Sequence, residues 1–411
     1  MREAAQSGAA RRADVVIAGG GLVGLSLGIA LAKAGLDVVV ADTEKPETRR
    51  AQAFDGRVSS IAQGSKRVLE GIGLWPGMAP EAEPILEIRV SDGDAPLFLH
   101  YDHKQVGTEP LGYIVENRVT RNAQLDLIAR LPTLEHRAPC KVTALTPEPG
   151  GVVATLSDGG AVRASLAVIA EGRESPLREA AGIGVTRWRY EQSGIVCTVA
   201  HERPHRGIAH ERFLPAGPFA ILPMTGNRSS IVWTEREVLV PGLLALPEGR
   251  FLVELKRRFG DFLGALEVVG SRRSYPIALC HARRYVAERI ALVGDSAHGI
   301  HPIAGQGLNL GIRDVAALAE IIVDHRRLGL DVGGRDVLAR YERWRRFDST
   351  VMIAVTDSLN RLFSNDLAPV QLARDLGLAA VNRVPRLKRL FMRHAMGTVG
   401  DLPRLARGEK L

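Results

Sequence analysis

Short apolar runs near the N-terminus have the pattern of two buried strands with a helix between them. Residues 14–18 (DVVIA) and 37–41 (DVVVA) are almost entirely apolar, as are strands that are buried on both faces. In the segment between them, LSLGIALAKAG, apolar residues recur at helical spacing, and Gly35 at its end is a typical helix stop. Strand, helix and strand in this order predict a βαβ unit with a parallel sheet.

The rest of the chain mixes helical periods with strand-like alternation. Residues 85–103 and 190–240 predict antiparallel strands broken by turns, and residues 141–169 predict a meander. Other expected elements are helices over 64–74, 118–131 and 305–325, a buried strand over 289–293, and a basic helical region from 335 to about 397. This interleaving predicts a second, antiparallel-sheet domain inserted into the α/β domain.

The expected domain boundaries follow from that order of elements. A disordered leader occupies residues 1–12, and a helical region occupies residues 331–411. The α/β domain is discontinuous and the inserted sheet domain has two parts; their ranges are 13–75, 112–182 and 285–330 for the first, and 76–111 and 183–284 for the second.

A glycine motif joins the first predicted strand to its helix. Residues 19–24 have the form G-x-G-x-x-G, in which Gly19 permits a tight turn, Gly21 lets a pyrophosphate approach the backbone, and Gly24 lets helix and strand pack. The helix N-terminus adds N–H groups and a positive dipole end. Asp42 ends the second strand, where a carboxylate binds ribose hydroxyls and repels a 2′-phosphate. The motif predicts a dinucleotide site for FAD or NAD; the alternative is a glycine turn without a ligand.

The same segment has the outline of a signal peptide. Arg11 and Arg12 precede the uncharged residues 15–32, which approach the length of a membrane span. Five glycines in that stretch form one motif with a chemical purpose, and an acidic residue follows at the expected distance. We therefore favour the nucleotide-binding interpretation over targeting.

A second glycine-rich segment follows the predicted strand at 289–293. It contains GDSAH (294–298) and then HPIAGQGLNLGIRD (301–314), so a strand end again carries a carboxylate, Asp295, and a glycine loop opens a helix. His298 and His301 raise the possibility of a metal or a catalytic base. Because no third ligand is nearby in the sequence, we expect a hydrogen-bonded structural His–Asp pair and no metal.

These two segments resemble the signature of the ubiquinone-biosynthesis hydroxylases, class A flavoprotein aromatic monooxygenases related to para-hydroxybenzoate hydroxylase. The resemblance covers most of the chain, and HPIAGQGLNLGIRD is its most specific part. It implies a Rossmann-type FAD-binding domain with an interleaved antiparallel-sheet substrate domain and C-terminal helices. The other matching segments are FDGRVSSIAQGSKRVLEGIGLW (54–75), GYIVENRVTRNAQL (112–125), AEGRESPLREAAGI (170–183) and ERFLPAGPFAILPM (211–224).

The resemblance also implies roles for individual residues. The ADP half of FAD is assigned to Gly19, Gly21, Gly24 and Asp42. Arg57 is placed near the pyrophosphate or the ring, Glu116 and Arg121 beside the ribityl chain and adenine, and Asp295 on the ribityl hydroxyls. The catalytic flavin-edge loop, which includes no acid or base, comprises Pro302, Gly305, Gln306 and Gly307, and the isoalloxazine contacts continue to Leu308 and Asn309.

One position departs from the family pattern. The central motif usually has Asp-Gly, whereas this chain has Glu171-Gly172; Arg178 at the end of the motif is retained. Glutamate keeps the charge but reaches one methylene further, which puts in doubt the usual contact of this position with flavin and nicotinamide.

The implied reaction is hydroxylation of an aromatic ring. Reduced FAD reacts with O₂ to a C4a-hydroperoxide, whose distal oxygen attacks the ring of a prenylated phenol. The sequence has no second G-x-G-x-x-G, so the reductant is NAD(P)H bound transiently or an external electron-transfer protein. A dry pocket is expected from apolar residues of the second sheet, which are alternatively plain core: Phe213, Leu214, Pro215, Phe219, Ile221, Leu222 and Pro223. No residue stands out as the base that deprotonates the phenol.

Two other functions remain open on the sequence. One is a monooxygenase of another aromatic compound, which the specific loop match disfavours. The other is a non-catalytic scaffold that binds prenyl lipids in the ubiquinone pathway, which only the Glu171 departure favours.

Charge and cysteine content lead to expectations about the cellular location and the binding partners. The 411 residues carry a net charge of +8, which fits an anionic cofactor or membrane surface, and no nucleic-acid motif is present. Cys140, Cys197 and Cys280 form no disulfide or metal spacing, so the cytoplasm is expected. The basic segment 383–394, with leucines and a phenylalanine at helical spacing, predicts peripheral contact with the inner face of a membrane, or else a bundle helix with a solvated basic face. Other ubiquinone-biosynthesis proteins are possible partners, and the oligomeric state is open.

Overall fold

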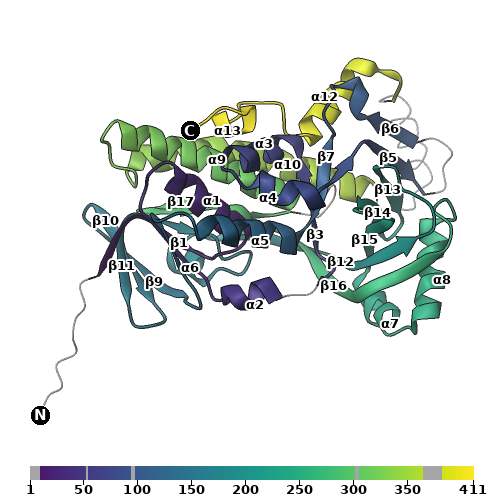
Figure 1. Ribbon diagram of the computed structural model, residues 1–411, viewed down its shortest axis with the longest axis horizontal. Helices are drawn as coiled ribbons and strands as arrows, with labels where there is room; N and C mark the ends of the chain where they lie inside the picture. The colour runs from purple at the N-terminus through teal and green to yellow at the C-terminus, as the bar shows by residue number, and fades with distance from the viewer. Residues whose placement is uncertain (1–9, 52–53, 94–97, 301–304, 364–381) are drawn as a thin grey trace, which may run out of the picture.

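The computed structural model describes residues 10–51, 54–93, 98–300, 305–363 and 382–411 (Figure 1). One large sheet lies at the left of the view and a second at the right, and long helices run across the region between them. The arrangement has the two-sheet α/β organisation that the interleaved pattern predicts.

The predicted βαβ unit opens the chain. Strand β1 (Arg11–Ala18) pairs in parallel with β2 (Val38–Ala41), and helix α1 (Leu22–Lys33) connects them. The strand begins within the expected leader, at Arg11, because the backbone there pairs with β11 and the Arg11 side chain forms ion pairs with Asp37 and Glu135. Residues 1–9 lie outside the described residues.

The first sheet has the strand order β17-β18-β11-β1-β2-β8, and β9 and β10 extend it from β11. The predicted meander is confirmed, since β9, β10 and β11 pair antiparallel while β11 also pairs in parallel with β1. Helices α1 and α5 (Asn117–Ile128) pack against each other beside this sheet. The remaining strands are β8 (Leu134–Arg137), β9 (Val142–Glu148), β10 (Gly151–Leu156), β11 (Ala161–Ile169), β17 (Val286–Ala287) and β18 (Ile290–Leu292).

The second sheet has the order β19-β16-β12-β15-β14-β13-β5-β6. All its pairs are antiparallel except β13 with β5. One face packs on helices α7 (Val240–Leu244) and α8 (Glu248–Phe259) around the fully buried Trp233 and Phe251. The strands are β5 (Glu87–Asp92), β6 (Phe98–Asp102), β12 (Val185–His201), β13 (Ile208–Leu214), β14 (Gly217–Met224), β15 (Arg228–Arg236), β16 (Leu266–Ala282) and β19 (His298–Gly299).

A small third sheet has the strand order β3-β7-β4, and its strands β4 and β7 contact β14 of the second sheet. The helix expected over 64–74 is α3 (Gln63–Gly71), which ends earlier because Gly73 takes a left-handed conformation with φ +80°. The other short elements are β3 (Val58–Ala62), β4 (Glu83–Ile85), β7 (Gly112–Glu116), α2 (Pro46–Ala51), α4 (Trp75–Met78), α6 (Pro176–Ala180), and the 3₁₀ turns η1 (Ala79–Glu81), η2 (His103–Gln105), η3 (Glu237–Leu239) and η4 (Gly294–Ser296).

Two long helices and two shorter ones make up the described C-terminal part. These are α9 (Gln306–Arg327), α10 (Arg335–Phe363), α12 (Pro385–Ala395) and α13 (Arg404–Arg407). Within the described ranges, no helix combines the length and apolar content that a membrane span requires. The expected domain boundaries stay a prediction.

Candidate active site

The glycine motif turns tightly at the carboxyl end of β1. Gly19 has a φ of +110°, and a Cβ there would come within 2.5 Å of the Ala170 carbonyl oxygen, so only glycine fits. A Cβ on Gly24 would collide with the Gly19 carbonyl, which explains the close packing of helix on strand. Gly21 is the N-cap of α1, and a Cβ there would meet nothing within 4 Å. The start of α1 therefore has room for a bulky anionic group.

Asp42 lies beside this loop, at the end of the neighbouring strand. Its side chain is buried, its Oδ1 accepts a hydrogen bond from the Glu44 amide at 3.2 Å, and its Oδ2 is 3.6 Å from His136 Nε2. A Cβ on Gly20 would collide with the Asp42 carboxylate. The carboxylate thus occupies the edge of the glycine loop, as a ribose-binding acid does.

A second helix start is built in the same way at α9. Gly305 is its N-cap with φ +61°, and a Cβ there would lie 2.7 Å from Ser60 Cβ. The Asn309 side chain accepts from the Ala62 amide at 2.9 Å and donates to the Ser60 carbonyl at 2.9 Å and the Gly305 carbonyl at 3.1 Å. Around Gly307 a Cβ would again find open space. Of the residues expected on this loop, Pro302 and His301 lie outside the described residues, Gln306 and Asn309 are buried, and Leu308 is half-buried.

The loop that carries Asp295 is hydrogen-bonded to residues 170–183, the motif in which Glu171 departs from the family pattern. Arg173 Nε donates to Asp295 Oδ2 at 3.1 Å, and the Asp295 side chain is 42% exposed. Arg178 is fully buried and donates to the Arg173 carbonyl at 2.9 Å and the Ser296 carbonyl at 3.1 Å. Arg178 therefore holds the two turns against each other. The unusual Glu171 accepts a hydrogen bond from the Ser175 hydroxyl at 2.8 Å and so also stabilises its own loop.

The other expected flavin-side residues form a charged cluster next to β3 and β7. Arg57 forms an ion pair with Asp55 at 2.7 Å, and Arg121 lies 3.9 Å from the same carboxylate. Burial acts to raise the pKa of Asp55, but hydrogen bonds and charge from Arg57, with the charge of Arg121, hold that pKa below its ordinary value. Glu116 is buried and accepts from Arg228 Nη2 at 3.2 Å.

His298 forms the expected hydrogen-bonded pair with an aspartate. His298 Nε2 lies 2.6 Å from Asp314 Oδ2, and both side chains are fully buried. Asp314 also accepts from the Gly294 amide at 2.9 Å and from Arg345 Nε at 2.8 Å. Burial acts to raise the pKa of Asp314, but the charges of His298 and Arg345 lower it overall. The pair holds the loop at His298 against helix α9. The described residues contain no group of three or more potential metal ligands.

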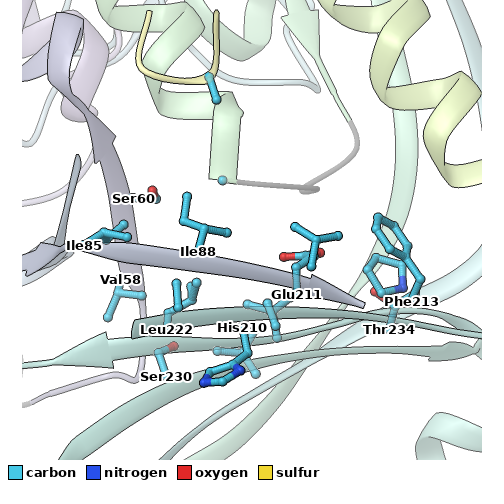
Figure 2. Close-up of a pocket in the computed structure, with 18 of the residues that line it drawn as sticks. Val58, Ser60, Ile85, Ile88, His210, Glu211, Phe213, Leu222, Ser230 and Thr234 are labelled. Carbon is cyan, nitrogen blue, oxygen red and sulfur yellow. The ribbon is translucent and has the colours of Figure 1, made fainter. Parts of the chain in front are cut away.

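A cavity of about 500 Å³ opens next to the start of α9 (Figure 2). Ser60 and Gly305 bound it on one side, and the face of the second sheet opposite to α8 forms its floor. Among the apolar residues expected in a pocket, Phe213 and Leu222 line the cavity. Phe219 and Ile221 alternate to the other face of β14 and pack in the core around Trp233, so for them the plain-core alternative holds.

The sequence reasoning missed the polar groups of the cavity. Tyr101, Glu211, Ser230, Thr234 and Tyr275 all line it. The alternation of β13 was the available signal, because it places Glu211 on the same strand face as Phe213.

Two glycine loops at uncapped helix starts, a buried acid at a strand end and an adjoining apolar cavity are the features of a dinucleotide-dependent enzyme. The family described as FAD binding domain matches residues 12–353. The chain belongs to this family of FAD-dependent monooxygenases, and FAD is therefore its cofactor.

The chain is similar to two hydroxylases in sequence and to a solved monooxygenase in fold. The chain is 58% identical over 402 residues to ubiquinone hydroxylase UbiL of Rhodospirillum rubrum, covering 97% of this chain and 94% of that protein. It is 33% identical over 386 residues to 3-demethoxyubiquinol 3-hydroxylase of Escherichia coli, covering 93% and 98%. Crystalline p-nitrophenol 4-monooxygenase PnpA of Pseudomonas putida superposes with a TM-score of 0.77 at 21% identity, covering 94% and 98%. The predicted fold class and family are confirmed.

Proposed function

We propose that this protein hydroxylates the aromatic ring of a prenylated phenol in ubiquinone biosynthesis, using FAD and O₂. The observation that carries the proposal is the apolar cavity that adjoins the flavin-edge helix α9. The similarity to a ubiquinone hydroxylase over nearly the whole chain supplies the substrate class. When bound, FAD supplies the activation of O₂ and the transfer of one oxygen atom.

Two features of the glycine loops suit FAD: the open space at the helix starts and a buried carboxylate. Gly21 and Gly307 leave the starts of α1 and α9 clear, and Asp42 supplies a carboxylate for the ribose. Asp295 and Arg57 would contact the ribityl and pyrophosphate side. NAD(P)H or an electron-transfer protein would supply the electrons.

The protein's own part is to hold the phenol and exclude water. The cavity volume of about 500 Å³ lies within the usual range for small-molecule sites and accepts a phenol ring with part of a prenyl chain. Its apolar lining strengthens every electrostatic contact that the ring makes there.

Complementation with quinone profiling tests this proposal. The gene is expressed in bacterial strains that each lack one ubiquinone hydroxylase, and quinones are measured by mass spectrometry. Restored ubiquinone in one strain supports the proposal and identifies the ring carbon. Absence of rescue in every strain by FAD-loaded protein refutes it, and O₂ consumption with other phenols then separates another aromatic substrate from a scaffold.

We further propose that helix α12 rests on an anionic membrane surface. Met392 and Met396 pack the helix onto the molecule, whereas Leu387, Leu390 and Phe391 are 37%, 51% and 45% exposed. Arginines alternate with these apolar side chains, as in helices that lie in a lipid interface. A long prenylated substrate would then enter from the bilayer.

Vesicle co-sedimentation tests the membrane contact. We expect the wild type to bind vesicles that contain phosphatidylglycerol and the double variant Leu390→Glu, Phe391→Glu to lose this binding. Leu239→Glu, at an exposed apolar residue on a different element, serves as the matched control. Equal binding by both variants would refute the assignment to α12.

A further inference from the structure

One carboxylate interrupts a row of apolar side chains on the floor of the cavity. The register of the second sheet pairs Glu211 with Val90 of β5 on one side and with Ala220 of β14 on the other. The row continues through the printed pairs on both sides and all its members line the cavity: Leu99, Val90, Glu211, Ala220, Val232 and Val196. Five of the six positions are aliphatic, and the sixth bears a negative charge when ionised.

The Glu211 side chain faces the cavity. Ala209, Glu211 and Phe213 share one face of β13. The ring of the intervening His210 lies tilted beside that of Phe262, with the ring centroids 4.7 Å apart. Figure 2 shows Glu211 and His210 pointing to opposite sides of the strand.

Nothing in the described part of the chain neutralises this carboxylate by a hydrogen bond or an ion pair. The other titratable residues that line the cavity are Arg57, which is paired with Asp55, and Tyr101, His210 and Tyr275. Burial raises the pKa of Glu211 to about 7. An unpaired carboxylate in an apolar site is costly unless a ligand supplies the missing partner.

The neighbouring titratable groups do not offer an alternative base. Burial raises the pKa of both Tyr101 and Tyr275 to about 12. Burial, with the charges of Arg89 and Arg212, lowers the pKa of His210 to about 4, and its ring lies on the side of the strand opposite to Glu211. Two further polar atoms on the cavity wall, the hydroxyls of Ser230 and Thr234, are buried without a partner among the described residues.

We propose that Glu211 is the catalytic base of the hydroxylation and accepts the proton of the substrate's phenolic hydroxyl. This inference rests on the proposed function. In the step, the phenolic O–H bond breaks, an O–H bond forms on the Glu211 carboxylate, and the electron pair stays on the phenolic oxygen. No oxidant or reductant takes part, and the resulting phenolate ring is richer in electrons for oxygen transfer.

The pKa values favour this role over that of an ordinary glutamate. A free phenol has a pKa of about 10 and a solvated glutamate one of about 4.3, a gap of roughly 6. Burial of Glu211 narrows that gap to roughly 3. A base whose pKa lies near the working pH is the most effective general base.

Single-turnover kinetics tests the role without a physiological reductant. FAD-loaded protein is reduced anaerobically with dithionite and mixed with O₂ and 2-geranylphenol, and the hydroxylated product is measured by mass spectrometry. In the wild type we expect the rate at low substrate to rise with pH through an apparent pKa near 7. Glu211→Gln should lose the pH-dependent limb, and its rate should fall by about 10²- to 10⁴-fold with little change in the half-saturation concentration. Glu211→Asp should recover part of the lost rate.

A matched control comes from the neighbouring strand. Glu87 on β5 is a partly buried carboxylate paired with Arg89 at 3.0 Å, away from the cavity lining, and Glu87→Gln should keep the wild-type profile. An unchanged pH limb in Glu211→Gln would overturn the proposal. A Glu211→Gln protein in which only the half-saturation concentration changes would also overturn the proposal, because Glu211 would then contact the substrate without acting as a base.

A binding measurement keeps the two proposals separable. The infrared difference spectrum of the oxidised protein on addition of 2-geranylphenol reports the Glu211 carboxyl group. With the wild type we expect a carboxylic-acid band that titrates near pH 7 and shifts when the phenol binds, and with Glu211→Gln no such band. If the wild-type band responds to the phenol but no product forms, the proposed function fails while Glu211 stands. If both proteins give the same difference spectrum, the assignment of Glu211 is wrong even where product forms.

Discussion

The ionised Glu211 carboxylate should weaken the folded state, and this cost should appear as a pH-dependent difference in stability. Burial raises its pKa from 4.5 to about 7. Between these pH values the folded state binds more protons than the unfolded state, so stability falls as the pH rises through the window. At about 1.4 kcal/mol for each pKa unit, the loss reaches about 3 kcal/mol above pH 7.

Comparison with Glu211→Gln isolates this contribution. The buried amide that Glu211→Gln introduces has its own cost in stability, but that cost does not change with pH. Any pH dependence of the stability difference between the variant and the wild type therefore comes from the Glu211 carboxylate. With an unfolding entropy of about 2.1 cal/mol/K per residue over the whole chain, 3 kcal/mol corresponds to about 3 to 4 °C in Tm. We therefore expect the Tm of Glu211→Gln minus that of the wild type to grow by about 3 to 4 °C from pH 4.5 to pH 8.

Differential scanning fluorimetry at one scan rate measures this change. Glu87→Gln should show no such trend, because burial acts to raise the pKa of Glu87 but Arg89 and His100 lower it overall. The wild type gains stability from Glu87 as the pH rises through the window below 4.5, so the Tm difference of that variant should stay nearly constant from pH 4.5 to pH 8. A Tm difference for Glu211→Gln that stays constant to within about 1 °C over the range would refute the burial of an unpaired carboxylate.

Two further substitutions test the flavin site and its support. Gly21→Val should reduce flavin occupancy to less than about a tenth, because the open space at the start of α1 is where a pyrophosphate fits; Gly249→Val, at another open helix start, should retain flavin in the absorbance spectrum. Asp314→Asn should lower the free energy of unfolding by about 3 kcal/mol, since it leaves the buried Arg345 guanidinium undercompensated. Asp348→Asn, at a partly exposed partner, should cost less in urea denaturation.

The parts of the fold that the sequence predicted are those with a local cause. Strands β1 and β2 are apolar throughout because both their faces are buried, and the glycine spacing at residues 19–24 is set by one turn. The meander over 141–169 and the start of α9 were equally visible, because turn residues and helical periods lie next to each other in the chain.

The features that were misjudged or missed depend on contacts between distant segments. The beginning of β1 at Arg11 is decided by Glu135 and by the pairing with β11, neither of which has a local signal. The partner of His298 was expected to be an aspartate, but its identity as Asp314, and the further bond from Arg345, depend on how α9 and α10 pack.

Glu211 shows why the missing base could not be assigned from the pattern alone. The period of two in a strand over 208–214 places Glu211 and Phe213 on one face, but apolar and polar residues occur on both faces. One face of this sheet packs against α8, however, and the other forms the floor of the cavity, so both carry apolar residues. Alternation therefore cannot tell the core face from the cavity face. The register with β5, which comes from a segment more than one hundred residues earlier, places Glu211 in an aliphatic row and turns an ordinary strand carboxylate into a candidate base.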